Sequence, residues 1–190
     1  LAEPEASRPL TTYVFRTRAE WERMTRQLLG ENAGPFLRIE RGGYAWGGIA
    51  VLFDLDGSHG ASRDTLSLVA HEGWHQFTQA TFKQPLPPWL EEGLATLCEG
   101  YRWTGGETVA TFAPADNVER RSQLARLVAA GRLRSVQSLV LDLPADLAAG
   151  QSGAALDYYA QIWALALYLR EEPHYAAALA SCVEDARDGR

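Results

Sequence analysis

The pattern of apolar residues changes once along the chain, and this change constrains the fold more than any other feature. Segments rich in β-branched and aromatic residues predict strands at residues 12–16, 36–40 and 44–54. From Asp64 onward apolar residues recur at helical spacing, which predicts helices at about residues 64–81, 87–101, 118–130, 157–170 and 174–186. Strands followed by helices indicate an α+β fold, with a small mixed or antiparallel sheet packed on a helical C-terminal half.

Capping and glycine signals divide the first half of the chain. Thr17-Arg18-Ala19-Glu20 has the spacing of a capping box, so a helix is expected to begin there and to end at Gly30. Arg41-Gly42-Gly43 predicts a hairpin turn between the second and third strands. Gly47-Gly48, inside the third strand, predicts a bulge or a place where another backbone approaches closely.

Length and composition place the chain among ordinary globular proteins. It has 190 residues, of which 46% are hydrophobic and 22% are charged. These values exclude disorder, and we expect one domain at residues 11–190. The net charge of −6 argues against a nucleic-acid partner held by phosphate contacts. Every apolar run is shorter than the roughly 18 residues that a membrane span needs, so we expect no membrane span.

The start of the chain and its cysteines bear on the compartment. The one methionine is Met24, and residues 1–10 contain two prolines and two glutamates, as expected of a flexible leader. Removal of an export signal and simple trimming explain this start equally well, so an exported (periplasmic or cell-envelope) and a cytoplasmic location both stay open.

Cys98 and Cys182 match no metal-binding or redox spacing. We expect small buried thiols, or a disulfide between them if the protein is exported.

The segment His71-Glu72-Gly73-Trp74-His75 carries the chemistry. Residues four apart on a helix differ by about 40° around its axis, so His71 and His75 share one face. Two imidazoles on consecutive turns can reach one Zn²⁺ at roughly 2.0–2.1 Å, and Glu72 lies beside them, where its carboxylate could take a proton from a water. The simpler alternative is a solvated helix face that binds no metal.

A catalytic zinc site needs a third protein ligand, and the helix after Pro87-Pro88 offers candidates. Glu91 and Glu92 point about 100° apart on that helix, so only one of them can face the metal. Glu99 lies seven positions after Glu92 and therefore shares its face within about 20°. Glu99 could accept a hydrogen bond from the far nitrogen of a ligating histidine, which would fix its tautomer. For Glu91 and Glu99 ordinary surface charge is the alternative.

Together these residues resemble the signature of the gluzincin zinc peptidases, in which a helix with HExxH is followed by a second helix that carries a ligand glutamate. Trp89-Leu90-Glu91-Glu92-Gly93-Leu94-Ala95 is similar to the pattern of the peptidase-MA-like group, which includes aminopeptidase-N-like enzymes. In that group the glutamate directly before the glycine is the ligand, which implies Glu92. From about Tyr44 to Leu169 the chain also resembles a bacterial domain-of-unknown-function family, number 1570, whose members are proposed to be metallopeptidases.

A third stretch, Asp157-Tyr158-Tyr159-Ala160-Gln161, resembles the start of the helix that carries a catalytic tyrosine in these relatives. The resemblance implies that Tyr159 is the counterpart and Tyr158 its neighbour. A phenol at this place can donate a hydrogen bond to the oxyanion of a tetrahedral intermediate. The alternative is a packing tyrosine on an apolar helix.

The relatives also bind an extended peptide along an edge strand beside the zinc, which here implies the strand at residues 44–54. Aminopeptidases of the group carry a glutamate on that strand to hold the free amine. Between Arg41 and His71 the sequence contains no glutamate. We therefore expect an endopeptidase rather than an aminopeptidase.

The resulting hypothesis is a zinc-dependent peptidase that hydrolyses peptide or protein substrates. One Zn²⁺ is expected on His71, His75 and Glu92, with Glu72 as the general base and Tyr159 as the oxyanion donor. Two alternatives stay open, a zinc-bearing binding or scaffold module without turnover and a metal-free structural helix. The sequence does not fix the oligomeric state.

Overall fold

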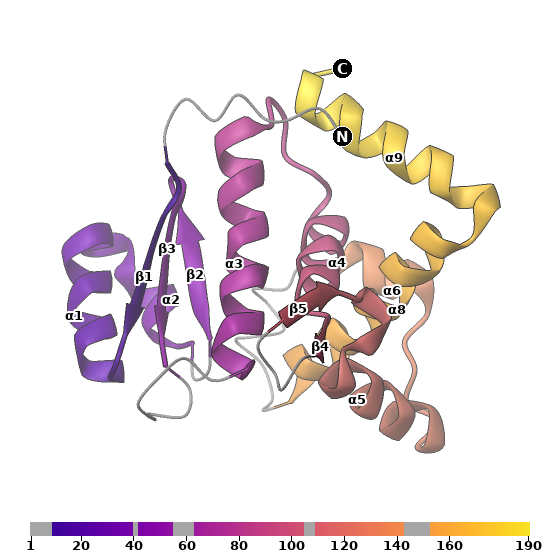
Figure 1. The fold of residues 1–190 in the computed structure, drawn as a ribbon, viewed down its shortest axis with the longest axis horizontal. Helices are drawn as coiled ribbons and strands as arrows, with labels where there is room; N and C mark the ends of the chain where they lie inside the picture. The colour runs from indigo at the N-terminus through magenta and orange to yellow at the C-terminus, as the bar shows by residue number, and fades with distance from the viewer. Residues whose placement is uncertain (1–8, 40–41, 55–62, 105–108, 143–152) are drawn as a thin grey trace. The chain divides into compact units, whose positions relative to one another are not determined.

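The computed structural model describes residues 9–39, 42–54, 63–104, 109–142 and 153–190 (Figure 1). The chain divides into two compact units, one up to Phe82 and one from Lys83. The leader expected at residues 1–10 lies outside the described residues except for residues 9 and 10. The predicted α+β fold is confirmed, since a small mixed sheet lies in the first unit and helices dominate the second. Within the described part of the chain, no helix combines the length and the apolar character needed to cross a membrane.

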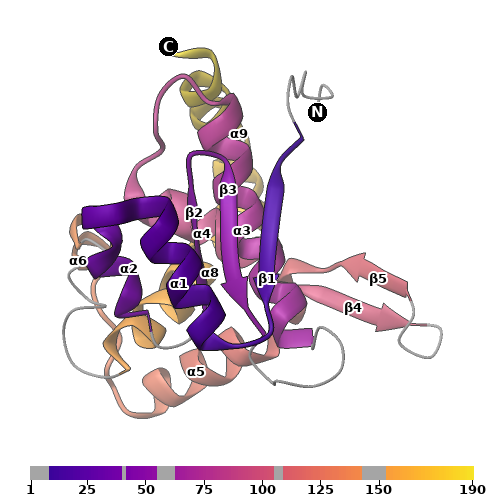
Figure 2. The same ribbon diagram turned by 90° about the vertical axis from the view of Figure 1, so that its left-hand side faces the viewer.

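The first unit contains a three-stranded sheet with the strand order β1-β3-β2 (Figure 2). β1 (Thr11–Phe15) pairs in parallel with β3 (Ile49–Phe53), and β2 (Gly43–Trp46) pairs antiparallel with β3. The strand predicted at residues 12–16 is therefore confirmed within one residue at each end. β1 and β2 form the two edges of this sheet.

Two helices of the first unit cover opposite faces of the sheet (Figure 1). α1 (Arg18–Leu29) begins with the predicted capping box of Thr17 and Glu20 and ends at Gly30, whose φ is +54°. Its Trp21 is fully buried and donates a hydrogen bond from Nε1 to the carbonyl of Val51 at 3.0 Å. α3 (Arg63–Thr81) covers the other face, as predicted at residues 64–81.

The strand predicted at residues 36–40 is wrong, because residues 33–37 form the short helix α2 (Ala33–Leu37) after a 3-10 turn. Phe36 does not alternate between core and solvent but packs into the core beside Tyr44, with their ring centroids 4.7 Å apart. Pro35 stands in the first turn of α2, where a missing N–H costs no helical hydrogen bond. Residues 40 and 41 lie outside the described residues.

The long strand predicted at residues 44–54 is in fact a hairpin formed by β2 and β3. Gly47 and Gly48 separate the two strands with φ values of +58° and +79°. A two-residue turn of type I′ needs positive φ at both central residues, and glycine adopts it without strain. Gly47-Gly48 is therefore the turn and not a bulge, and the turn predicted at Arg41-Gly42-Gly43 is wrong, since Gly43 already begins β2.

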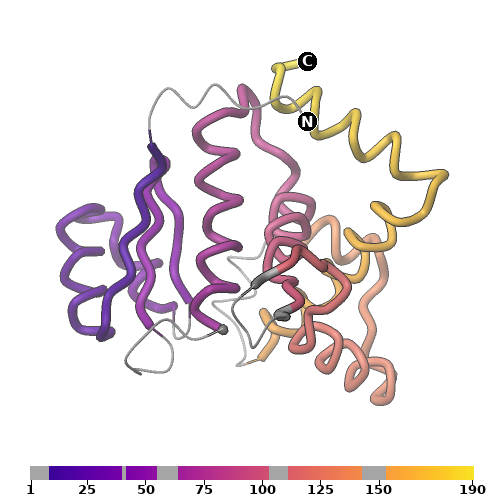
Figure 3. Tube along the Cα trace, in the orientation of Figure 1, coloured from indigo at the N-terminus to yellow at the C-terminus, as the bar shows by residue number. Residues whose placement is uncertain are grey.

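The second unit is built around α8 (Ala154–Glu171), against which α4 (Pro88–Cys98), α5 (Val118–Ala129) and α6 (Val136–Leu141) pack. Figure 3 follows the trace from α8 into α9 (Pro173–Asp188). The helices predicted at residues 118–130, 157–170 and 174–186 are confirmed within three residues at each end. The hairpin of β4 (Tyr101–Thr104) and β5 (Val109–Phe112) and the short α6 were not predicted.

The helix predicted to run to Tyr101 ends earlier, at Cys98. Gly100 explains the early end, because a Cβ there would lie 2.6 Å from the carbonyl oxygen of Ala113 and 2.7 Å from Cα of Pro114. The chain passes so close to residues 113 and 114 that the helix cannot continue, and it turns into β4 instead.

Candidate metal centre

His71 and His75 lie on one face of α3, as the four-residue spacing predicts. Their Nε2 atoms are 3.3 Å apart, and the two rings meet edge to face. His71 is 8% exposed and the adjacent Glu72 only 5%. His71 and the Glu72 carboxylate are therefore largely withdrawn from water, while His75, one turn further along the helix, is partly exposed.

Gln76, the residue after His75, fixes this helix to the sheet. Its amide Nε2 donates to the main-chain carbonyls of Thr11 at 2.8 Å and Gly48 at 3.0 Å. Its Oε1 accepts a hydrogen bond from the hydroxyl of Thr12 at 3.0 Å. Both donors of this buried amide and one acceptor site of its oxygen are directed at β1 and the β2–β3 turn, which sets the rotation of α3 at the histidine pair. The sequence pattern predicted no role for Gln76.

Glu92 lies on α4, and the glycine that follows it has a packing reason. A Cβ at Gly93 would lie 3.1 Å from Cβ of Ala166 and 3.4 Å from the carbonyl oxygen of Ile162. α4 and α8 thus approach each other closely at this position, which leaves little room for a larger side chain. The glutamate-glycine pair puts Glu92 at the point where α4 contacts α8.

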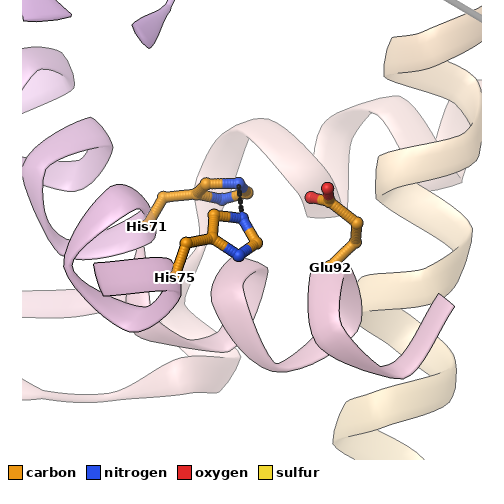
Figure 4. A group of neighbouring side chains, drawn as sticks. All are labelled: His71, His75 and Glu92. Atoms are coloured by element: carbon orange, nitrogen blue, oxygen red, sulfur yellow. Dashed lines mark hydrogen bonds between the residues drawn. The ribbon is translucent and has the colours of Figure 1, made fainter. Parts of the chain in front are cut away.

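The predicted ligands appear together in one group of side chains. His71, His75 and Glu92 each offer one ligand atom, and these atoms lie within 4.8 Å of one another (Figure 4). Two nitrogens and one carboxylate oxygen are the donor atoms of many zinc sites. Metal binding by this group stays a prediction.

Glu99, at the C-terminal cap of α4, forms an ion pair with Arg120 of α5. The guanidinium donates from Nη2 to Oε1 at 2.8 Å and from Nε to Oε2 at 3.0 Å, and Asn117 donates to Oε2 at 2.8 Å. The side chains of Glu99 and Arg120 are only 10% and 12% exposed. Burial alone would lower the pKa of Arg120, but the Glu99 carboxylate raises it overall. Glu99 is thus not an ordinary surface charge, while its predicted bond to a ligating histidine stays a prediction.

The two tyrosines of α8 have different surroundings. Tyr159 is partly exposed, and the guanidinium carbon of Arg120 lies 5.3 Å from the centroid of its ring. Tyr158 is fully buried, and among the described residues its hydroxyl has no hydrogen-bond partner. Burial, and next the charge of Glu92, raise the pKa of Tyr158 to about 12. The sequence predicted no role for Arg120 or Tyr158. The nearest local signal is Asn117, the N-cap of α5 three residues before Arg120.

Both cysteines are free thiols. Cys98 is partly buried on α4, and burial raises its pKa to about 11, whereas Cys182 on α9 is exposed. The disulfide considered from the sequence is not formed.

The sequence profile of one protein family, described as protein of unknown function (DUF1570), matches residues 65–187. The match covers more than half of the chain, so the protein belongs to this family. No curated protein and no solved structure matches the chain.

Proposed function

We propose that this member of the DUF1570 family is a zinc-dependent peptidase of the gluzincin type, with endopeptidase activity. The observation that carries the proposal is the distance of 3.3 Å between Nε2 of His71 and Nε2 of His75. A tetrahedral ion with Zn–N distances of about 2.0–2.1 Å separates two of its ligand atoms by about 3.3–3.4 Å. The histidine pair thus has the spacing of two ligands of one tetrahedral ion.

The chemistry of the donor set favours zinc among the common metals. Ca²⁺ and Mg²⁺ prefer sites made of oxygen atoms, whereas two imidazoles and one carboxylate suit Zn²⁺. His71, His75 and Glu92 would hold the ion. Three protein ligands leave a coordination position for water, as catalytic rather than structural zinc sites do.

Glu72 and Tyr159 would then have separate roles in hydrolysis. Bound zinc supplies a Lewis acid that polarises the scissile carbonyl and lowers the pKa of a water to about 7. Glu72, buried beside His71, accepts the proton of the attacking water and passes it to the leaving amine. Tyr159 donates a hydrogen bond to the oxyanion, and the Arg120 cation against its ring favours the phenol as a donor.

β2 is the strand on which an extended substrate would bind. Trp46 and Ile49, which flank the turn, form a hydrogen-bonded pair. Such pairs alternate along the hairpin, so the N–H and C=O of Ala45 point away from β3, to the open edge of β2. Gln79 donates to the Ala45 carbonyl at 3.2 Å, and the Ala45 N–H and the groups of Gly43 face the same edge. β2 carries no glutamate that could hold a free amine, which supports an endopeptidase.

Substitution of the general base tests the proposal. Glu72→Gln should keep stoichiometric zinc but lose at least about 100-fold in hydrolysis of unfolded casein, because the proton of the water has no acceptor. Glu22→Gln, on the surface of α1, is the matched control and should hydrolyse at the wild-type rate. An unchanged rate in zinc-loaded Glu72→Gln would refute the mechanism. Wild-type protein that binds zinc and hydrolyses nothing would instead favour a non-catalytic zinc module.

A further inference from the structure

The hydroxyl of Tyr158 needs an explanation. The residue is 0% exposed, and among the described residues no group forms a hydrogen bond with its hydroxyl. Buried hydroxyls in folded proteins almost always have a partner, because an unpaired one has lost its hydrogen bonds to water without replacement. A phenylalanine would fill the same volume without this cost, so packing alone does not explain a tyrosine.

The packing of α8 against α4 brings Tyr158 close to Glu92. Tyr158, Ile162 and Ala166 are four residues apart, are all fully buried and so form one stripe along α8. Gly93 of α4 contacts the last two members of this stripe. Glu92 directly precedes Gly93, and Tyr158 lies one turn before Ile162.

The direction of the two helices supports this placement. Cys98, the last residue of α4, is influenced by the charge of Arg170 near the end of α8. Both helices therefore run in the same general direction, and the start of α4 lies beside the start of α8. The charge of Glu92 acts on the Tyr158 hydroxyl in agreement with this arrangement.

The other carboxylate near Tyr158 already has its own partners. Asp142 accepts hydrogen bonds from Arg134 and, at 3.0 Å, from the hydroxyl of Ser138. The contact between α4 and α8 places Glu92 near the Tyr158 hydroxyl, so its carboxylate is the acceptor that this hydroxyl can serve.

We propose that Tyr158 is a positioning residue for Glu92, to whose carboxylate its hydroxyl donates a hydrogen bond when Glu92 binds a cation. This inference rests on the metal site of the proposed function. A carboxylate ligand uses one oxygen for the metal, and a donor on the other oxygen fixes its orientation.

The variant Tyr158→Phe removes the hydroxyl and keeps the ring packed against Leu139 and Ile162. Without metal it should unfold at the same temperature as the wild type or higher, because no hydrogen bond is lost. With metal its affinity for zinc should fall about 10–100-fold, the usual effect of removing a hydrogen-bond partner of a ligand. A purely structural role of the hydroxyl would lower stability without metal and leave zinc affinity unchanged.

The experiment is a competition titration of zinc-free protein with Zn²⁺ and a chromophoric chelator, in the absence of substrate. Tyr168→Phe, which removes an exposed hydroxyl from the same helix, is the matched control and should keep the wild-type dissociation constant. In a Glu92→Asp background, where the carboxylate is withdrawn by one methylene, Tyr158→Phe should have no further effect. A wild-type zinc affinity in Tyr158→Phe, or an equal loss in Tyr168→Phe, would overturn the proposal.

Failure of this inference differs from failure of the proposed function. If the wild type binds zinc but hydrolyses nothing, the peptidase is refuted and the role of Tyr158 can still be supported by the affinities. If the wild type hydrolyses casein and Tyr158→Phe binds zinc normally, only the role of Tyr158 is refuted. A wild type that binds no zinc refutes both.

Discussion

Replacing Gln76 by leucine should weaken the first unit more than any other single substitution on the sheet-facing side of the HExxH helix. The change keeps the approximate volume of the side chain and removes three hydrogen bonds, two donated to carbonyls at 2.8 and 3.0 Å and one accepted at 3.0 Å. Each such bond contributes about 1 kcal/mol net. Thr11 and Thr12 are exposed residues, so water can replace part of their bonds to Gln76, and we expect a loss of about 2–3 kcal/mol in the free energy of unfolding.

Gln79 provides a matched control on the same helix. It also bonds to the sheet, accepting from the N–H of Gly48 and donating to the carbonyl of Ala45, both at 3.2 Å. Its side chain is exposed, so water replaces both bonds, and Gln79→Leu should cost less than about 1 kcal/mol.

Urea unfolding of the metal-free proteins, followed by far-ultraviolet circular dichroism, measures both variants against the wild type. The midpoint of Gln76→Leu should fall clearly below that of Gln79→Leu, with unchanged slopes. Equal midpoints for the two variants would refute the reasoning, because burial of the Gln76 amide would then make no difference to its hydrogen bonds.

Three further predictions concern Gly93 and the two cysteines. Gly93→Ala would place a Cβ 3.1 Å from Cβ of Ala166 and 3.4 Å from the carbonyl oxygen of Ile162. The free energy of unfolding should therefore fall by about 1–3 kcal/mol, which a lower thermal midpoint would report. Cys182 should react with a chromogenic disulfide reagent at pH 8 within the dead time of manual mixing, and Cys98 should react only on unfolding, because its pKa is raised to about 11. Because the pKa of Cys98 is raised, its protonated thiol stabilises the fold below pH 9, and this contribution is lost as pH rises toward 11. The free energy of unfolding of Cys98→Ala should therefore fall less steeply with pH over this range than that of the wild type. Rapid labelling of both thiols at pH 8 would contradict the burial of Cys98.

The parts of the fold that sequence predicted correctly are those set by neighbours in the chain. The capping box of Thr17 and Glu20 and the stop at Gly30 need only residues within one turn of the helix ends. The convergence of His71 and His75 needs only the helical period. Such signals do not depend on what the helix packs against, so they can be predicted before the fold is known.

The mistakes arose where two local signals competed and a distant contact decided between them. Arg41-Gly42-Gly43 and Gly47-Gly48 are both acceptable turns, and the choice depends on Tyr44 pairing with Val51 and packing beneath Trp21. Phe36 is compatible with a strand or a helix, and its contact with Tyr44 favours the helix. Hydrophobic period alone cannot decide such cases, because a segment of five residues is too short to show one.

The residues around the candidate site could not be predicted from the sequence, because they also depend on contacts between distant segments. Glu99 and Arg120 are 21 positions apart, with a hairpin between them, and no period relates residues at that separation. Tyr158 and Tyr159 are neighbours whose side chains differ by about 100° around α8, so Tyr158 is buried beside Leu139 and Ile162 while Tyr159 lies against Arg120. The sequence identifies this pair of tyrosines but does not determine their roles, because each role depends on which residues the side chain contacts. Two phenylalanine substitutions can assign these roles. Tyr158→Phe should lower zinc affinity and Tyr159→Phe should lower the rate of hydrolysis, so the two assays distinguish two tyrosines that the sequence motif does not distinguish.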